Sequence, residues 1–149
     1  MGDIVKNSYD FVKKFKKKYP ITVAFRIRKH CEIIEKHINP DEEILYAFAA
    51  QKNDSPMMLI NTCAVALTNK RSVIGLKRLL WGYFFISITP AMFNDLTVNS
   101  GLIWGGIVID TIKEKVILTN IDPKALPEIE SIITDYMMKE KKKYKDRED

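Results

Sequence analysis

The sequence predicts an α+β fold in which seven short antiparallel strands form a small bent barrel, plugged by a C-terminal helix and preceded by two helices. Two observations support this prediction. Residues 44–121 contain short β-type runs joined by tight turns, whereas helical periodicity is confined to the segments on either side of them. A single amphipathic helix then follows at about 125–142. This order is typical of an antiparallel meander closed by one helix.

Two helical patterns occupy the first forty residues. The first covers 3–19, where apolar residues recur close to every 3.6 positions and lysines fall largely on the opposite side. Its apolar stripe contains Ile4, Phe11, Phe15 and Tyr19. Pro20 breaks the pattern, and a second helix is predicted over about 21–38. The stripe of the second helix contains Val23, Ile27, Cys31, Ile34 and Ile38.

The period changes after Asn39-Pro40-Asp41, and seven strands are predicted from there. They cover 44–52, 59–68, 71–79, 83–89, 95–99, 102–110 and 115–121. In the second strand Leu59, Cys63, Val65 and Leu67 share one face. Gly75, in the middle of the third strand, predicts a bend of the kind that barrels need at corners.

The last helix is predicted from a stripe at i, i+3, i+7 and i+11, formed by Leu126, Ile129, Ile133 and Met137. Pro123 and Pro127 suit a helix start, and lysines at 139 and 141–143 suit its C-terminal end. Residues 144–149 are expected to fray.

Length and composition fit one globular domain of 149 residues, with 46% apolar and 29% charged side chains. We expect a helical extension at 1–39, the barrel domain at 40–143 and a short tail. The net charge of +5 is unevenly spread, because basic residues predominate at 1–40 and 139–149 and acidic residues predominate between them. The N-terminus lacks a signal-peptide core, so we expect a cytoplasmic protein with reduced Cys31 and Cys63.

Local sequence adds a family resemblance. Asp41-Glu42-Glu43-Ile44, Ala66-Leu67-Thr68-Asn69-Lys70-Arg71, Gly101-Leu102-Ile103-Trp104-Gly105-Gly106 and Ile109-Asp110-Thr111 resemble bacterial pleckstrin-homology (PH) domains of the YokE-like group. The resemblance covers about 40–143. It implies a PH-like barrel that acts as a binding or assembly scaffold without catalytic residues or a cofactor.

The first loop departs from the PH domains that bind phosphoinositides. Those domains resemble one another in a basic loop between strands one and two. Here the loop reads Lys52-Asn53-Asp54-Ser55-Pro56 and lacks a cluster of cations that grips several phosphates. We therefore do not expect the phosphoinositide site in this loop.

No set of residues suggests catalysis or metal binding. His30 and His37 are two helical turns apart, about 10 Å, too far to share a zinc ion at ~2 Å per ligand bond. Asp41, Glu42 and Glu43 are predicted to form a solvated turn, and Asp110 and Glu114 to flank a hairpin. Gly101, Gly105 and Gly106 do not match a nucleotide-binding fingerprint.

Lys70, Arg71, Lys77 and Arg78 are the candidate anion ligands of the barrel. The two pairs lie at opposite ends of one predicted strand, about 20 Å apart, so they do not form one pocket unaided. Solvated structural roles are the alternative.

The first helix is the candidate membrane or partner face, formed by Phe11, Lys13, Lys14, Phe15, Lys17 and Lys18. Its aromatic side can dock on the barrel or a sister subunit, or lie at a membrane surface. No nucleic-acid-binding motif accompanies the charge. We expect a non-catalytic scaffold acting through protein contacts, with self-association through open strand edges. The alternative is a peripheral protein that binds anionic lipid at the inner membrane face through this helix.

Overall fold

The computed structural model describes residues 7–52 and 62–148, with side chains described as far as residue 143. Its helices are α1 (Ser8–Lys18), α2 (Ile27–His37), the short 3-10 helix η1 (Pro123–Ala125) and α3 (Leu126–Glu148). Its strands are β1 (Ile44–Lys52), β2 (Thr62–Thr68), β3 (Ser72–Lys77), β4 (Tyr83–Ile88), β5 (Phe93–Ser100), β6 (Gly105–Thr111) and β7 (Lys115–Ile121).

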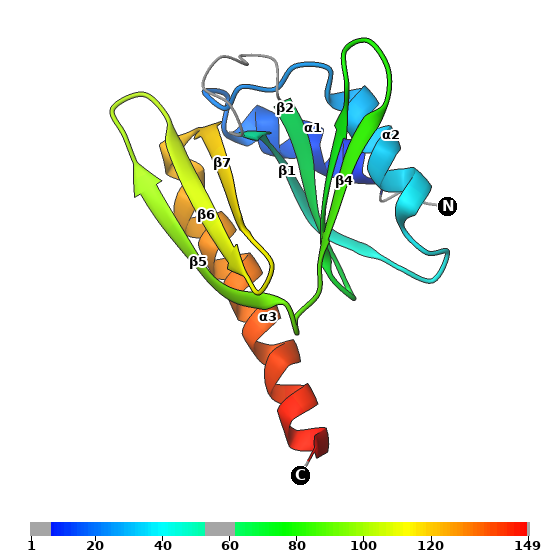
Figure 1. Ribbon diagram of the computed structural model, residues 1–149. Helices are drawn as coiled ribbons and strands as arrows, with labels where there is room; N and C mark the ends of the chain where they lie inside the picture. The colour runs from blue at the N-terminus through cyan, green and yellow to red at the C-terminus, as the bar shows by residue number, and fades with distance from the viewer. Residues whose placement is uncertain (1–6, 53–61, 149) are drawn as a thin grey trace, which may run out of the picture.

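The strands form one antiparallel sheet in the order β4-β3-β2-β1-β7-β6-β5. β1 pairs with β2 along its length, but it pairs with β7 only at Gln51 and Lys52. The sheet therefore consists of two halves, β1–β4 and β5–β7, that join at one corner (Figure 1). The predicted α+β arrangement of seven antiparallel strands, two N-terminal helices and one C-terminal helix is confirmed.

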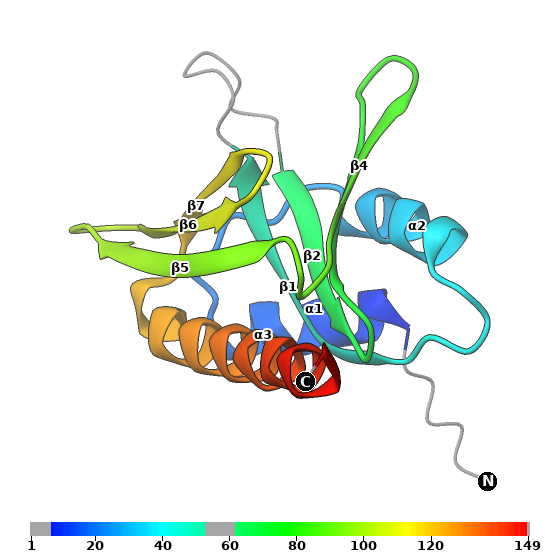
Figure 2. The ribbon, with the colours of Figure 1, turned by 60° about the horizontal axis from the view of Figure 1, so that its bottom comes forward.

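The main core lies between the two halves of the sheet. Alternate residues of β1 and β2, such as Phe48 and Val65, point into it and are 1% and 0% exposed. α3 closes the core with Ile129, Ile133 and Met137, the stripe predicted from the sequence. Figure 2 shows α3 lying across the open side of the sheet, with α2 on the other side of β1 and β2.

The opposite face of β1–β3 is also buried, because α1 and α2 pack on it. Its residues are mostly small, and they let the helices approach closely: Ala47, Ala49, Ala64, Ala66, Val73 and Gly75. A Cβ atom on Gly75 would lie 2.8 Å from the carbonyl oxygen of His30. The glycine predicted to bend the strand thus lies where α2 touches β3.

α1 is anchored to α3 as well as to the sheet. The Glu128 carboxylate accepts hydrogen bonds from Lys18 Nζ at 2.8 Å, Tyr19 Oη at 2.9 Å and Tyr46 Oη at 2.8 Å. Burial favours the neutral acid, but these three donors outweigh it and hold the pKa of Glu128 below its usual range. The first helix is therefore part of the folded body.

Several predicted boundaries were wrong. The second helix begins at Ile27 because residues 20–26 are held in an irregular path: Val23 N donates to Asn120 O, and Thr22 Oγ1 accepts from Asp122 N. β6 begins at Gly105, because 101–104 form a turn closed by Gly101 N and Trp104 O at 3.0 Å.

The terminal helices differ from their predictions too. α1 begins at Ser8, with the Asn7 side chain accepting from Asp10 N at 2.9 Å. α3 continues to Glu148, past its predicted end near 142. Leu59, residues 3–6 and the loop at 53–56 lie outside the described residues.

Candidate functional site

The connection between β3 and β4 presents three large apolar side chains to solvent. Leu79, Leu80 and Trp81 are 60%, 80% and 78% exposed. Arg78 N donates to Gly82 O at 3.0 Å, and Gly82 has a positive φ of 84° that suits the turn. A consecutive apolar run at a hairpin tip is unusual on a protein surface and indicates a contact surface.

The connection between β5 and β6 has the same character. Leu102, Ile103 and Trp104 are 104%, 63% and 41% exposed. Trp104 is fixed because its indole Nε1 donates to Ile21 O at 3.0 Å. A Cβ atom on Gly101 would lie 2.7 Å from Trp104 O, so this tight turn depends on glycine. The described residues therefore form two apolar hairpin tips that each end in tryptophan and glycine.

Residues 21–26 run across the same end of the molecule and connect the two tips (Figure 1). Their contacts follow in order: Ile21 with Trp104, Val23 with Asn120 at the end of β7, Phe25 N with Thr62 Oγ1 at the start of β2, and Arg26 Nη1 with Lys77 O at the end of β3. Ile21 and Phe25 are themselves 49% and 59% exposed. We call residues 21–26, 78–82 and 101–104 the hairpin end.

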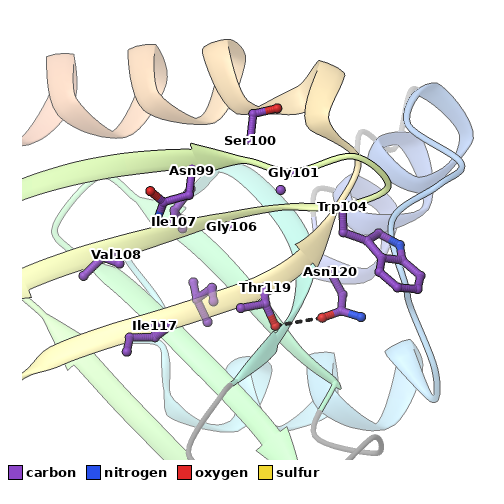
Figure 3. Close-up of a pocket in the computed structure, with 12 residues that line it drawn as sticks. Asn99, Ser100, Gly101, Trp104, Gly106, Ile107, Val108, Ile117, Thr119 and Asn120 are labelled. Atoms are coloured by element: carbon purple, nitrogen blue, oxygen red, sulfur yellow. Dashed lines mark hydrogen bonds between the residues drawn. The ribbon is translucent and has the colours of Figure 1, made fainter. Parts of the chain in front are cut away.

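A shallow groove of about 310 Å³ lies beside the second tip, on β5–β7 (Figure 3). Trp104 and Asn120 lie at one end of it, and Thr119 Oγ1 donates to Asn120 Oδ1 at 2.8 Å. Asn120 has a positive φ of 58°, which asparagine tolerates better than most residues. None of the described residues that line the groove is ionisable. The groove therefore offers amide, hydroxyl and apolar contacts.

The predicted anion ligands are divided between two places. Lys70 Nζ pairs with Asp41 at 2.7 Å, and Arg71 Nε pairs with Glu42 at 3.0 Å. Arg71 also donates to Ser87 Oγ and His37 O. Both cations at this end already contact carboxylates, whereas Lys77 and Arg78 lie at the other end of β3, at the base of the first hairpin tip. Anion binding by these side chains stays a prediction.

The prediction that Asp41, Glu42 and Glu43 form a solvated turn was wrong for Glu42. Its side chain is fully buried. Burial favours the neutral acid, but hydrogen bonds from Arg71, Thr68 and Asn39 outweigh it and hold the pKa of Glu42 below its usual range. The local sequence around Glu42 does not indicate this burial, because its partner Arg71 is 29 residues away in the sequence.

The predicted face of the first helix does not present its aromatic side. Phe15 is 4% exposed and packs in the main core, and Phe11 is partly buried. Lys18 pairs with Glu128 at 2.8 Å. Lys13, Lys14 and Lys17 are exposed. The first helix therefore presents charged side chains to solvent, and its aromatic side chains are at least partly buried.

Both histidines contact neighbouring elements of the fold. His30 is 1% exposed, and its Nδ1 accepts from Lys77 N at 2.9 Å. Burial, with a smaller contribution from Arg26, lowers the pKa of His30 to about 4. His37 stacks on Phe85 with ring centroids 4.2 Å apart.

The cysteines are buried, and burial raises the pKa of Cys31 to about 12. Within residues 7–52 and 62–148, no three or more His, Cys, Asp or Glu side chains are grouped to hold a metal ion. None of the helices in the described part of the chain has the length and apolar character to cross a membrane.

Sequence reasoning missed the hairpin end because it placed Leu79 and 102–104 in strands. A signal was available. Both tryptophans of the chain follow an aliphatic pair and precede glycine, as Leu79-Leu80-Trp81-Gly82 and Leu102-Ile103-Trp104-Gly105. Glycine after a bulky apolar run marks a turn, and a turn exposes the run.

The fold and the comparisons define the class of protein. A family model described as bacterial PH domain matches residues 38–135, and the chain belongs to this family. PH domains mediate protein or lipid binding and are typically non-catalytic. Comparison with curated proteins gives no match.

Proposed function

We propose that this protein is a peripheral membrane-binding module that inserts the two apolar tips of its hairpin end into the lipid interface. The observation that carries the proposal is the presence of two exposed tips, Leu79–Trp81 and Leu102–Trp104, at one end of the same sheet (Figure 1). A membrane is a flat apolar layer, and two tips projecting from one end match it. This proposal places the protein at the inner membrane face.

The energetics support a membrane contact. Full burial of one exposed leucine side chain stabilises the bound state by about 1.5–3 kcal/mol. Tryptophan favours the membrane interface, where its ring is apolar and its N–H group finds a polar partner. Lys77 and Arg78 lie at the base of the first tip. Cations close to an anionic surface add about 1 kcal/mol each.

The basic first helix contributes to this proposal in a different way from the one expected. An interfacial helix needs a free apolar face, and the apolar face of α1 is packed in the protein through Val12 and Phe15. The lysines of α1 therefore attract the surface, while the hairpin tips enter it.

Vesicle binding tests the proposal. The full chain is sedimented with vesicles of phosphatidylcholine containing 30% phosphatidylglycerol. The variant Leu79→Ser/Leu80→Ser is compared with Ile112→Ser/Met138→Ser, because Ile112 and Met138 are 65% and 51% exposed elsewhere on the surface. We expect the tip variant to bind at least about tenfold more weakly and the control to bind as the unmodified chain does. Equal binding by both variants would refute insertion.

A second function, contact with a protein partner or a second copy, is supported by the sheet edges. β4 pairs only with β3, and β5 pairs only with β6, among the described strands. Unpaired strand edges can accept another strand. Sedimentation velocity at increasing concentration tests self-association, and a monomer throughout contradicts it.

The turn sequence Ala66–Arg71 supports assignment of the chain to the YokE-like group.

A further inference from the structure

A groove lies on the outer surface of the protein, between α1 and the start of α2. Its volume is about 550 Å³. Five of the eight described side chains that line it are cationic, and none is acidic: Lys13, Lys16, Lys17, Arg26 and Arg28. The other lining residues are Tyr9, Ala24 and Ile27. This concentration of positive charge in a concave surface is distinct from the apolar hairpin tips.

Four of these five cations contact backbone carbonyl groups or an aromatic ring. Lys16 Nζ donates to Pro20 O and Thr22 O at 2.6 Å each, so its charge is fixed by backbone groups. Arg28 lies over the Tyr9 ring at 4.8 Å, and Lys13 lies over the same ring at 4.6 Å.

The start of α2 adds positive potential at the same place. Arg26 is the N-cap residue, with φ 54° and ψ 36°, and no side-chain hydrogen bond caps the helix in the described structure. The first turn of α2 has no acidic residue. A helix N-terminus carries partial positive charge and free N–H groups. It therefore reinforces the lysines and arginines that line the groove.

We infer that this groove binds a phosphoryl group, carried by a lipid head group or by a soluble phosphate ester. A phosphoryl group has several strong acceptor oxygens and a full negative charge, which lysine and arginine donors satisfy together. The site differs from the first loop of the barrel, because α1 and α2 form it. Binding of a lipid head group in this groove rests on the proposed membrane function. The groove borders the first apolar tip, because Arg26 Nη1 donates to Lys77 O at the base of that tip.

Inorganic phosphate tests the site without a membrane. Backbone amide shifts of the full chain are followed by NMR during titration with sodium phosphate, at constant ionic strength set with sodium chloride. We expect saturable shifts at residues 26–29 in the unmodified chain. The variant Lys13→Gln/Lys17→Gln/Arg28→Gln changes three exposed side chains and should weaken binding at least fivefold.

The matched control is Lys113→Gln/Lys115→Gln/Lys142→Gln, which removes the same charge from exposed positions outside the groove. It should bind phosphate like the unmodified chain. Equal weakening in both variants, or no saturable shift at 26–29, would overturn the site. So would saturable binding of a thymidine oligonucleotide without a response to phosphate.

Vesicles then identify the source of the phosphoryl group. With 30% phosphatidylglycerol vesicles, a lipid site predicts that the groove variant binds at least fivefold more weakly than the control. A phosphate response with equal vesicle binding by both variants supports a soluble ester. If both variants insert their tryptophans equally and neither phosphate nor lipid distinguishes them, the groove inference fails while the proposed function stands.

Discussion

At the scale of single residues, the charged groups that the fold buries are held by partners from distant parts of the chain. Glu42 precedes β1, whereas its partner Arg71 precedes β3, and Thr68 Oγ1 donates to the same carboxylate at 2.5 Å. A buried ion pair of this kind contributes little net stability as a unit, but loss of one partner leaves the other charge uncompensated.

Glu42→Gln should therefore destabilise the protein by about 3 kcal/mol. The neutral amide cannot match the Arg71 charge, whose side chain is 19% exposed. Urea unfolding followed by circular dichroism measures the change. Asp41→Asn is the control, because the Lys70–Asp41 pair is exposed and should contribute less than about 1 kcal/mol. An equal effect of the two substitutions would contradict the structural role of Glu42.

His30 predicts a pH dependence. Its pKa falls from 6.5 when unfolded to about 4 when folded, so the unfolded chain binds the proton first as the pH falls. The contribution of neutral His30 to the free energy of unfolding is therefore fully present above about pH 6.5. It decreases as the pH falls to about 4, by up to about 3 kcal/mol. His30→Gln keeps a hydrogen-bond acceptor for Lys77 N and should flatten this part of the profile. An unchanged slope between pH 6.5 and 5 would contradict the prediction.

At the scale of elements, the packing of α2 on β3 requires the absence of a side chain at Gly75. An added Cβ would meet His30 O at 2.8 Å, the Ile34 side chain at 3.0 Å and that of Ile33 at 3.2 Å. The nearest of these atoms is backbone, so the helix as a whole has to move. Such overpacking typically destabilises by about 1–3 kcal/mol.

Gly75→Ala should lower the free energy of unfolding by about 1–3 kcal/mol, although alanine generally suits a strand no worse than glycine. Thermal and urea unfolding measure the effect. Thr97→Ala, at an exposed position of β5, serves as the control and should change stability by about 0.5 kcal/mol or less. A neutral Gly75→Ala would show that α2 does not press on β3.

The sequence predicted the elements that have a clear period and missed those set by tertiary contacts. The stripe Leu126–Met137 and the inward face of Cys63 and Val65 follow from periodicity alone, and the structure confirms them. The irregular path at 21–26 does not follow from periodicity, because hydrogen bonds to Asn120 and Asp122 hold it. These partners lie a hundred residues away, and no local pattern indicates them.

The candidate site was predicted less well than the fold. The sequence indicates Lys13 and Lys17 as candidate contact residues, but the groove that unites them with Arg26 and Arg28 depends on how α1 and α2 pack. The apolar tips carry residues such as Leu102 and Ile103, which are equally typical of strands. Turn geometry, set by the Gly101–Trp104 hydrogen bond, decides that they are exposed.

At the scale of the whole molecule, the hairpin end is directed away from the end of α3. The hairpin end lies at one end of the sheet, and the end of α3 projects from the opposite end (Figure 1). The cationic groove between α1 and the start of α2 borders the hairpin end through Arg26. A surface bound at the hairpin end would therefore not contact the end of α3.

Tryptophan fluorescence tests the central claim most directly, because the two tryptophans of the chain, Trp81 and Trp104, lie on the two apolar tips. Vesicles with 30% phosphatidylglycerol should shift their emission to shorter wavelength, and brominated lipids should quench it. Trp81→Phe and Trp104→Phe should each remove part of the quenched signal. Protein that sediments with vesicles while its tryptophan emission stays unshifted and unquenched would contradict insertion of the hairpin end.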